Sequence, residues 1–319
     1  MKISVVIPTY KREKDLSECL DSILGQSFLP VEVFVIDNAR ENATKASVQG
    51  QKEIFSSRGI RLEYIDNSKE NSLTVARNWG IKMCGGDVIS FLDDDVILDK
   101  DYYKEVAKFF NDNDKAIGVS AQTIGNLYET SKIKFMFAQL LGRIFFLGYY
   151  EKYECHVLPS MGVTSLMGNN SVSSEWISGA SAYKRKIFSE FLFDEKLKKY
   201  SWDEDLDFSY RIYKKYPGTL FFNSRIKYLH KLSEIGRTQG RERIYMEEIY
   251  NLYLFYKLMP QNLKNKIIYI WSRIGTIFYR LVKGKFLDTR LCVSALILCL
   301  KNLHKIKQGN LDFFNKTLK

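Results

Sequence analysis

The amino-acid sequence predicts an α/β protein with an open, mostly parallel β-sheet and flanking helices, followed by a basic helical region. Two observations lead to this prediction. Over the first 120 residues, short continuous apolar runs alternate with amphipathic segments, as in a parallel sheet that is buried on both faces. The excess positive charge lies at the other end, where residues 236–319 hold 16 Lys and Arg against 5 Asp and Glu.

The composition excludes several other classes of protein. A hydrophobic content of 45% with only 5 Pro excludes a disordered chain. Five widely spaced Cys without a CxxC pair argue against a disulfide framework or a structural zinc site and favour a reducing, intracellular compartment. The apolar stretches Leu291–Leu300 and Phe135–Tyr150 do not predict a transmembrane helix, because the first has half of the ~20 residues required and Arg143 interrupts the second.

The order of the sheet elements follows from the apolar pattern. Strands are predicted at Ile3–Ile7, Val31–Ile36, Leu62–Ile65, Val88–Leu92 and Ile117–Ser120. Helices are predicted between them, at roughly Lys14–Gln26, Ala43–Ser57, Leu73–Cys84 and Lys100–Asn111. Ligands of such sheets bind beyond the carboxyl ends of the strands, so the residues that follow each strand are candidates for a site. These residues are Pro8-Thr9-Tyr10, Asp37-Asn38, Asp66-Asn67 and Asp93-Asp94-Asp95.

The rest of the chain divides into an irregular middle and a helical end. Ile124–Ser174, which includes the polar run Met167–Ser174, has no regular pattern and is interpreted as a functional loop or lid. Regular pattern resumes at Glu175–Tyr183, with a helix at Glu204–Tyr216, strands at Leu220–Phe222 and Ile226–Leu229, and helices at Arg241–Lys257, Leu263–Val282 and Leu287–Ile306. We therefore expect a body at 1–235 and an appendage at 236–319.

The second appendage helix has a distinctive charge pattern. Lys266, Arg273 and Arg280 recur every seven residues among apolar positions, and a narrow cationic stripe on a wide apolar face suits a helix in a membrane interface. The alternative is a helix packed on the body or on a second subunit, with its charges in water. Nucleic acid is disfavoured as a partner because the aromatic residues fall on the apolar side of the helices.

The strongest local signal is the run of three carboxylates Asp93-Asp94-Asp95 directly after a buried strand. Such a cluster is tolerated where a divalent cation or a network of donors neutralises it. In extended geometry Asp93 and Asp95 point to one side, so one carboxylate could hold Mg²⁺ or Mn²⁺ while its neighbour accepts hydrogen bonds from a sugar. The alternative is a solvated turn that caps the next helix.

A second acidic cluster opens the helix at Glu204–Tyr216. Asp203, Glu204, Asp205 and Asp207 fall within five residues, which is more than the helix dipole requires. A carboxylate held near apolar Trp202 and Phe208 could have a raised pKa and take a proton from a hydroxyl.

Six ordered motifs over about residues 1–235 resemble the inverting family 2 glycosyltransferases of GT-A fold, which have a Rossmann-like sheet. They are Val5–Arg12 with Leu20–Ser27, Val35-Ile36-Asp37-Asn38, Ala76–Ile81 with Gly85-Gly86-Asp87, Phe91–Asp95, Gly179-Ala180-Ser181 and Glu204-Asp205. The resemblance implies Mn²⁺ or Mg²⁺ and a nucleotide-diphosphate sugar donor. It implies Asp205 as the catalytic base, within the Glu204-Asp205 motif.

The resemblance also implies binding roles for other residues. A nucleotide-sugar site would be formed by Pro8, Thr9, Tyr10, Asp37, Arg77, Asp93, Asp94 and Gly179. The metal would be held by Asp95, Asp93 and His230. Arg77 could reach the diphosphate or simply be solvated, and the basic stretch from Lys231 to Arg241 could close over the diphosphate.

The sequence also admits other functions. Asp93 and Asp95 fit the Asp-x-Asp signature of a haloacid-dehalogenase-like phosphatase, although three strand–helix units precede them. A dinucleotide-binding oxidoreductase is disfavoured because no GxGxxG follows the first strand. A non-enzymatic binding module would leave two carboxylate clusters unexplained.

The implied partners define a location. A glycan or lipid-linked acceptor, together with an anionic membrane surface contacted through residues 260–319, predicts a cytoplasmic enzyme that is peripheral on the inner face of the cell membrane. It would act in surface polysaccharide or glycoprotein glycan synthesis. The sequence leaves open whether the chain forms a homo-oligomer.

Overall fold

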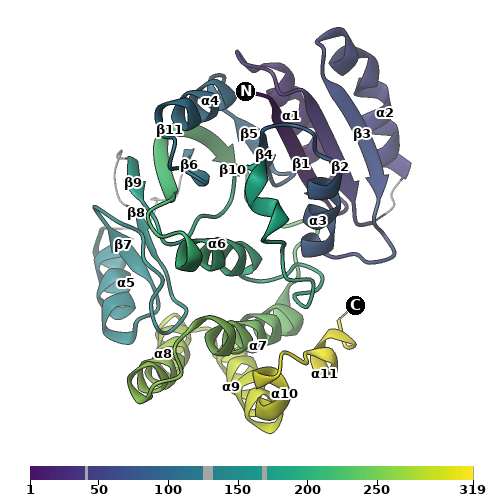
Figure 1. Cartoon of the computed structure of the whole chain (residues 1–319). Helices are drawn as coiled ribbons and strands as arrows, with labels where there is room; N and C mark the ends of the chain where they lie inside the picture. Colours follow the sequence, from purple (N-terminus) through teal and green to yellow (C-terminus); the bar gives the residue numbers. More distant parts are fainter. Residues whose placement is uncertain (40–41, 125–131, 167–170, 319) are drawn as a thin grey trace.

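A nine-stranded sheet is the centre of the computed structural model, which describes residues 1–39, 42–124, 132–166 and 171–318 (Figure 1). The strands lie in the order β3-β2-β1-β4-β10-β6-β11-β5, with β9 paired to β11. Those that run in one direction are β3 (Arg61–Asp66), β2 (Glu32–Asp37), β1 (Ile3–Thr9), β4 (Val88–Phe91), β6 (Gly118–Ile124) and β11 (Leu220–His230). Antiparallel to them run β10 (Ser181–Lys184), β5 (Val96–Leu98) and β9 (Ser171–Ser173). The predicted α/β class with a mostly parallel sheet is confirmed.

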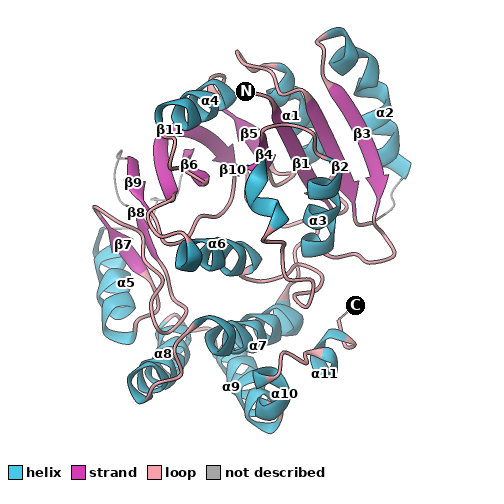
Figure 2. Cartoon of the chain, in the orientation of Figure 1, coloured by secondary structure: helices cyan, strands magenta, loops and turns pink. Residues whose placement is uncertain are grey.

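Helices cover both faces of this sheet (Figure 2). Alternate residues of β1 show the division, because Ile3, Val5 and Ile7 pack in one core and Val6 packs in another. The first core is completed by α1 (Glu13–Leu24), α2 (Asn42–Ser57) and α4 (Tyr102–Asp112), and the second by α3 (Leu73–Met83) and α6 (Glu204–Lys215). A Cβ at Gly80 would lie 2.4 Å from Val6 Cγ1, so glycine is what allows α3 to approach β1.

The middle of the chain is more regular than the sequence predicts. Within Ile124–Ser174 the structure has α5 (Lys132–Phe145), β7 (Tyr149–Glu151), β8 (Thr164–Leu166) and β9, so the interpretation as an irregular loop or lid is wrong for these segments. Strands of three residues are too short to show a period. The helical period of α5 is not evident because most of this helix lies in the nearly continuous apolar run Phe135–Tyr150. Residues 125–131 and 167–170 of this region lie outside the described residues.

The C-terminal helices form a third core beside the sheet (Figure 1). They are α7 (Gly240–Leu258), α8 (Leu263–Val282), α9 (Phe286–Lys301), α10 (Leu303–Lys307) and α11 (Asp312–Asn315). Leu197 and Leu206 share this core with Ile249 and Leu254 of α7, so the appendage is packed on the body. The helix predicted at Leu287–Ile306 is divided at Asn302. In the described part of the chain, all helices are too short or too polar to span a bilayer.

The orientation of α8 differs from the expected one. Arg273 Nη1 lies 3.2 Å from Glu248 Oε2, and Arg280 Nη2 lies 2.8 Å from Glu247 Oε2, so both arginines face α7. Lys266, the third member of the cationic stripe, is exposed. Most of the stripe therefore neither lies in water nor borders a membrane, because it pairs with the buried Glu248 and the half-buried Glu247 of α7.

Candidate active site

Both acidic clusters open onto one cavity at the carboxyl ends of the strands. Its volume is about 320 Å³, and Asp93, Asp94 and Asp95 line it together with Asp203, Glu204 and Asp205. The first cluster follows β4 and the second begins α6, about 110 residues later. Strands that are distant in the chain are neighbours in the sheet, and this order brings the two segments together.

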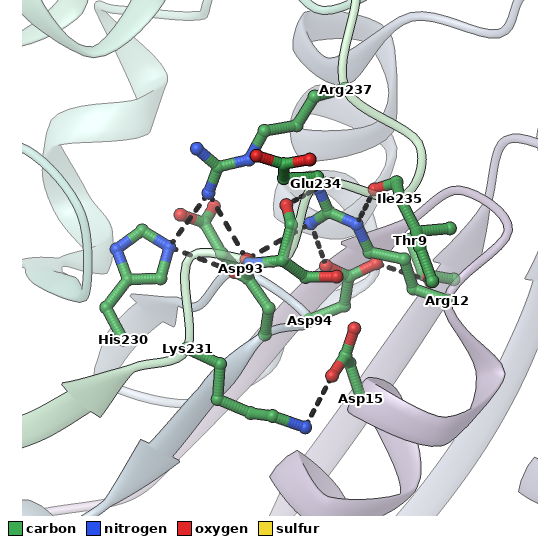
Figure 3. Close-up of polar contacts among 12 residues, drawn as sticks. Thr9, Arg12, Asp15, Asp93, Asp94, His230, Lys231, Glu234, Ile235 and Arg237 are labelled. Carbon is green, nitrogen blue, oxygen red and sulfur yellow. Dashed lines mark hydrogen bonds and ion pairs between the residues drawn. The ribbon is translucent and has the colours of Figure 1, made fainter.

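The middle carboxylate of the first cluster is held by the last residue of β1 and by the loop after it. Thr9 Oγ1 donates to Asp94 Oδ2 at 2.7 Å, and Arg12 Nη1 donates to Asp94 Oδ1 at 2.7 Å (Figure 3). Burial raises the pKa of Asp94 to about 6, although Arg12 and Thr9 oppose this shift. Because both carboxylate oxygens of Asp94 have partners, this residue fixes the loop after β1 against the loop after β4.

The third carboxylate is surrounded by donors from the segment after β11. His230 Nε2 lies 3.0 Å from Asp95 Oδ1, while Oδ2 accepts from the Ser233 N–H at 3.0 Å and from Arg237 Nη2 at 3.3 Å. Burial alone would raise the pKa of Asp95, but the hydrogen bond from His230 and the charges of His230, Arg12 and Arg237 lower it to about 2. Asp95 is therefore ionised over the whole physiological range.

The residues Asp93, Asp95 and His230 form a candidate metal site. Each offers one ligand atom, and these atoms lie within 4.8 Å of one another. The pairing of β11 with β5 places His230 opposite Val96, and thus beside Asp95. Two carboxylate oxygens and an imidazole nitrogen are a donor set that Mn²⁺ accepts, and two oxygens with water suit Mg²⁺. The residues present therefore fit the cation that the family resemblance implies.

The second acidic cluster lies at the first turn of α6. Asp203 precedes the helix in a left-handed conformation, with φ of 61°. Burial and the nearby charges of Asp205 and Glu247 raise its pKa to about 7. Glu204 Oε1 lies 2.9 Å from Arg77 Nη1, and Arg77 Nη2 lies 3.7 Å from Asp93 Oδ1. The buried guanidinium of Arg77 thus joins the two clusters.

Asp205 has the environment expected of a base. It lines the cavity, and the hydrogen bond given to its side chain comes from its own helix, from the Leu206 N–H to Oδ1 at 2.8 Å. Burial raises the pKa of Asp205, although the charge of Arg77 opposes this. A carboxylate with a raised pKa binds a proton more strongly than an exposed aspartate does.

The structure places the remaining predicted residues as follows. Pro8, Thr9, Tyr10 and Gly179 line the cavity. Gly179 has φ of 63°, and a Cβ there would lie 2.6 Å from the Tyr228 hydroxyl. Asp37 lies behind the cavity wall, where it accepts from the Tyr64 hydroxyl at 2.8 Å, and its neighbour Asn38 reaches the wall instead. Arg77 also lines the cavity, but it is paired with carboxylates rather than solvated.

Sequence reasoning missed two contributors to this site. Arg12 was part of a motif, yet its pairing with Asp94 was not foreseen, because nothing in the spacing places a residue after β1 beside one after β4. The Ser233 N–H is a backbone donor and carries no sequence signal at all. The basic stretch from Lys231 to Arg241 was singled out by its charge, but its contacts with Asp95 were not predicted.

A second, larger cavity continues from the first. It has a volume of about 1120 Å³ and shares Trp202, Asp203, Asp205 and Arg237 with the first cavity. From there it extends between α5 and α7 to the inner face of α8, at Thr276. Asp205 therefore borders two spaces, with the carboxylates after β4 on only one side.

The comparisons with known proteins identify the family. The family description "Glycosyl transferase family 2" matches residues 4–172, and the chain belongs to this family. Its sheet has the GT-A-like arrangement implied by the sequence resemblance. This assignment favours glycosyl transfer over the phosphatase alternative.

Curated relatives match part of the chain. "Glycosyltransferase GlyA" of Streptococcus pneumoniae is 30% identical over 201 residues, which is 60% of this chain and 26% of GlyA. "Poly(ribitol-phosphate) beta-N-acetylglucosaminyltransferase TarS" of Staphylococcus aureus is 29% identical over 115 residues, which is 35% of this chain and 19% of TarS. The aligned regions thus span about a quarter or less of these two relatives.

Solved structures show the same fold over nearly the whole chain. The structure of S. aureus TarS 1-349 in complex with UDP-GlcNAc has a TM-score of 0.57 at 17% identity and covers 98% of this chain and 89% of that one. The mannosyltransferase PcManGT from Pyrobaculum calidifontis, in complex with GDP-Man and Mn²⁺, has a TM-score of 0.56 at 14% identity and covers 97% and 85%. At these identities the likeness concerns the fold alone.

Proposed function

We propose that this protein transfers a sugar from a nucleotide-diphosphate sugar to a hydroxyl of an acceptor, with inversion at the anomeric carbon. The catalytic domain is residues 1–235, and residues 236–319 are an associated basic helical region. The observation that carries the proposal is the shared cavity, which Asp205 lines together with the carboxylates that follow β4. Inverting transfer requires both groups in one cavity, because a base must take the proton from the acceptor while the charge of the leaving diphosphate is neutralised on the other face of the sugar.

Asp205 is the proposed general base. Its side chain lines the cavity, and its raised pKa favours taking the proton from the acceptor hydroxyl as that oxygen attacks. Glu204, its neighbour in the same motif, is held by Arg77 and keeps the start of α6 in place. Proton removal and bond formation then occur in one step, without a covalent enzyme intermediate.

Asp93, Asp95 and His230 would hold Mn²⁺ or Mg²⁺. When bound, the cation neutralises the negative charge that develops on the departing diphosphate. The chain itself prepares this position, because Asp95 is ionised and fixed by His230, Arg237 and the Ser233 N–H. Arg237 and Arg12 bring further positive charge to the diphosphate end of the cavity.

The donor is proposed to lie over the carboxyl ends of β1 and β4 and the residues that follow them. Thr9, Tyr10, Asn38 and Asp93 line that part of the cavity, and Gly179 leaves space beside Tyr228. Asp37 would contact the base of the nucleotide from a position behind Asn38. TarS was captured with UDP-GlcNAc and the mannosyltransferase with GDP-Man, so relatives of this fold accept either a uridine or a guanosine donor.

The acceptor is proposed to enter through the larger cavity, which reaches Asp205 from the side of α5 and α8. A volume of about 1120 Å³ suits a glycan or the head group of a lipid-linked glycan. The name of TarS describes transfer to a poly(ribitol-phosphate) polymer, which supports an acceptor of surface-polymer type. The basic charge of residues 236–319 supports work at the inner face of the cell membrane.

The test is product analysis on the full chain. Nucleotide sugars are screened with Mn²⁺ for release of the nucleoside diphosphate. Water serves as the sugar acceptor in the first screen, and candidate acceptors are added in the second. Asp205→Asn should reduce turnover by about 100-fold or more while donor binding is retained. Phosphate release from phosphomonoesters without nucleotide-sugar turnover would contradict the proposal.

A further inference from the structure

Helices α5 and α8 expose apolar side chains at the same helical spacing. In both helices these residues recur at positions that share one face, so each helix carries a continuous apolar stripe. On α5 the stripe is Ile133, Met136, Phe137, Leu140 and Ile144, and on α8 it is Ile267, Ile270, Trp271, Ile274, Phe278 and Leu281, all between 43% and 80% exposed. Contiguous apolar surface of this extent marks an interaction site.

The two stripes belong to one surface, here called the α5–α8 surface. The Phe145 ring stacks on the Trp271 ring with centroids 5.0 Å apart, and Trp271 Nε1 donates to the Ile144 carbonyl at 2.8 Å. A Cβ at Gly275 would lie 2.3 Å from Phe145 Cβ, so glycine allows the helices to approach closely. Both helices lie at the edge of the molecule remote from α1–α3 (Figure 1).

The opposite face of α8 explains why its apolar side points outward. Arg273 and Arg280 pair with Glu248 and Glu247 of α7, and Glu248 is almost fully buried. Turning α8 over would bury the apolar stripe but would leave Glu248 without its partner, at a high cost in free energy. The inner faces of α5 and α8 line the larger cavity, so the surface and the path to Asp205 are two sides of one helix pair.

The charged residues of α5, of α8 and of the segment directly after α8 are all positive. Residues 132–145 and 263–287 contain neither Asp nor Glu. Lys264, Lys266 and Lys283 are exposed on or directly after α8, and Phe286 beyond them is 71% exposed. Apolar side chains on helices whose own charges are all positive are the pattern of a helix that lies in the interface of an anionic membrane.

We propose that the α5–α8 surface docks on an anionic phospholipid bilayer, with both helices in the interface and neither crossing it. The inference rests on the proposed function for its membrane-linked acceptor and extends the membrane contact to α5, within the catalytic domain. A second copy of the chain fits less well, because a two-fold contact would bring the lysines of both copies together. Docking in this way opens the larger cavity beside the lipid head groups.

The experiment measures binding of the full chain to vesicles of phosphatidylglycerol and phosphatidylcholine. Met136→Glu with Leu140→Glu on α5, and Ile270→Glu with Ile274→Glu on α8, should each weaken binding by at least about tenfold. The matched control is Ile54→Glu on α2, an equally exposed apolar side chain outside the surface, which should bind as the unmodified chain does. Lys264→Glu with Lys266→Glu should reduce binding to these vesicles but leave the weaker binding to pure phosphatidylcholine unchanged.

Three results would overturn the inference: no binding by the unmodified chain, binding by both glutamate double variants that equals that of the unmodified chain, or loss of binding in the α8 variant alone. A lipid-free dimer that both double variants convert to monomer would assign the surface to a second copy. Thermal unfolding checks that each variant is folded, and the lysine pair gives a second route if an apolar variant is not. Donor turnover is measured on the same samples, so a chain that binds vesicles but transfers no sugar refutes the proposed function and not the docking.

Discussion

Arg77 and Glu204 form an ion pair of 2.9 Å in the wall of the cavity, and the same guanidinium lies 3.7 Å from Asp93. Burial alone would lower the pKa of Arg77, but the charges of Glu204 and Asp93 outweigh burial and raise this pKa above its usual value. The side chain therefore stays protonated. Arg77 thus supplies the positive charge between two groups of carboxylates that would otherwise repel each other across a narrow space.

Replacing this arginine should destabilise the protein strongly. We expect Arg77→Met to lower the free energy of unfolding by about 3–5 kcal/mol, because Glu204 is then buried without a partner. Urea unfolding at neutral pH measures the change. The control is Arg61→Met, which breaks an exposed pair with Glu63 and should change stability by less than about 1 kcal/mol. Equal effects of the two substitutions would show that Arg77 is not needed to neutralise the cluster.

Metal binding should depend on Asp95. We expect Asp95→Ala to weaken Mn²⁺ binding by at least about tenfold, because one carboxylate ligand and the partner of His230 are both removed. Calorimetric titration with Mn²⁺ and a nucleoside diphosphate measures the affinity. Asp101→Ala removes an exposed carboxylate remote from the cavity and should leave it unchanged. Normal affinity in Asp95→Ala would remove this residue from the metal site.

The pH dependence of turnover should follow the ionisation of Asp205. Because burial raises the pKa of this carboxyl, turnover should fall on the acid side at a pH above the ordinary aspartate value of about 4. The measurement is kcat against pH at saturating donor and metal. In Asp205→Asn the residual rate should lose this acid limb. An unchanged limb in that variant would assign it to another group.

The ionised form of Asp203 should lower the free energy of unfolding at neutral and alkaline pH. Its folded pKa of about 7 lies above the unfolded value of about 4, so stability falls as pH rises between these values and the full loss is present above pH 7. We expect Asp203→Asn to be about 1–3 kcal/mol more stable than the unmodified chain at pH 8.5, with the gain shrinking toward pH 5. Asparagine also tolerates the left-handed backbone at this position. Thermal unfolding at both pH values tests this, and a gain that is independent of pH would point to the backbone instead.

The fold was predictable where the hydrophobic pattern is long. The strand that ends at Thr9 and the helix at Leu263–Val282 were both found from periodicity, and the latter with its observed ends. Short elements were not found, because β5 at Val96–Leu98 is three residues long and follows the acidic cluster directly. The inward direction of Arg273 and Arg280 on α8 was not predicted either. Their partners Glu248 and Glu247 lie on α7, so the sequence of α8 alone does not indicate them.

The site was predictable by residue type but not by contact. Carboxylates after a buried strand and at a helix start identify Asp95 and Asp205 as candidates from the sequence alone. Their hydrogen-bond partners depend on which loops meet in space, so neither the Arg12 to Asp94 bond nor the place of Asp37 behind the wall could be derived from spacing. The roles proposed for these residues stay predictions until the substitutions above are measured.

The pairing of β11 with β5 has a consequence for biosynthesis. Asp95 leaves the ribosome long before His230, and the antiparallel register that joins them needs the whole of β11. A nascent chain that stops before this strand therefore has Asp93 and Asp95 but lacks the His230 imidazole and Arg237. The capacity to bind a cation should appear late and abruptly during translation, when most of the sheet has already emerged.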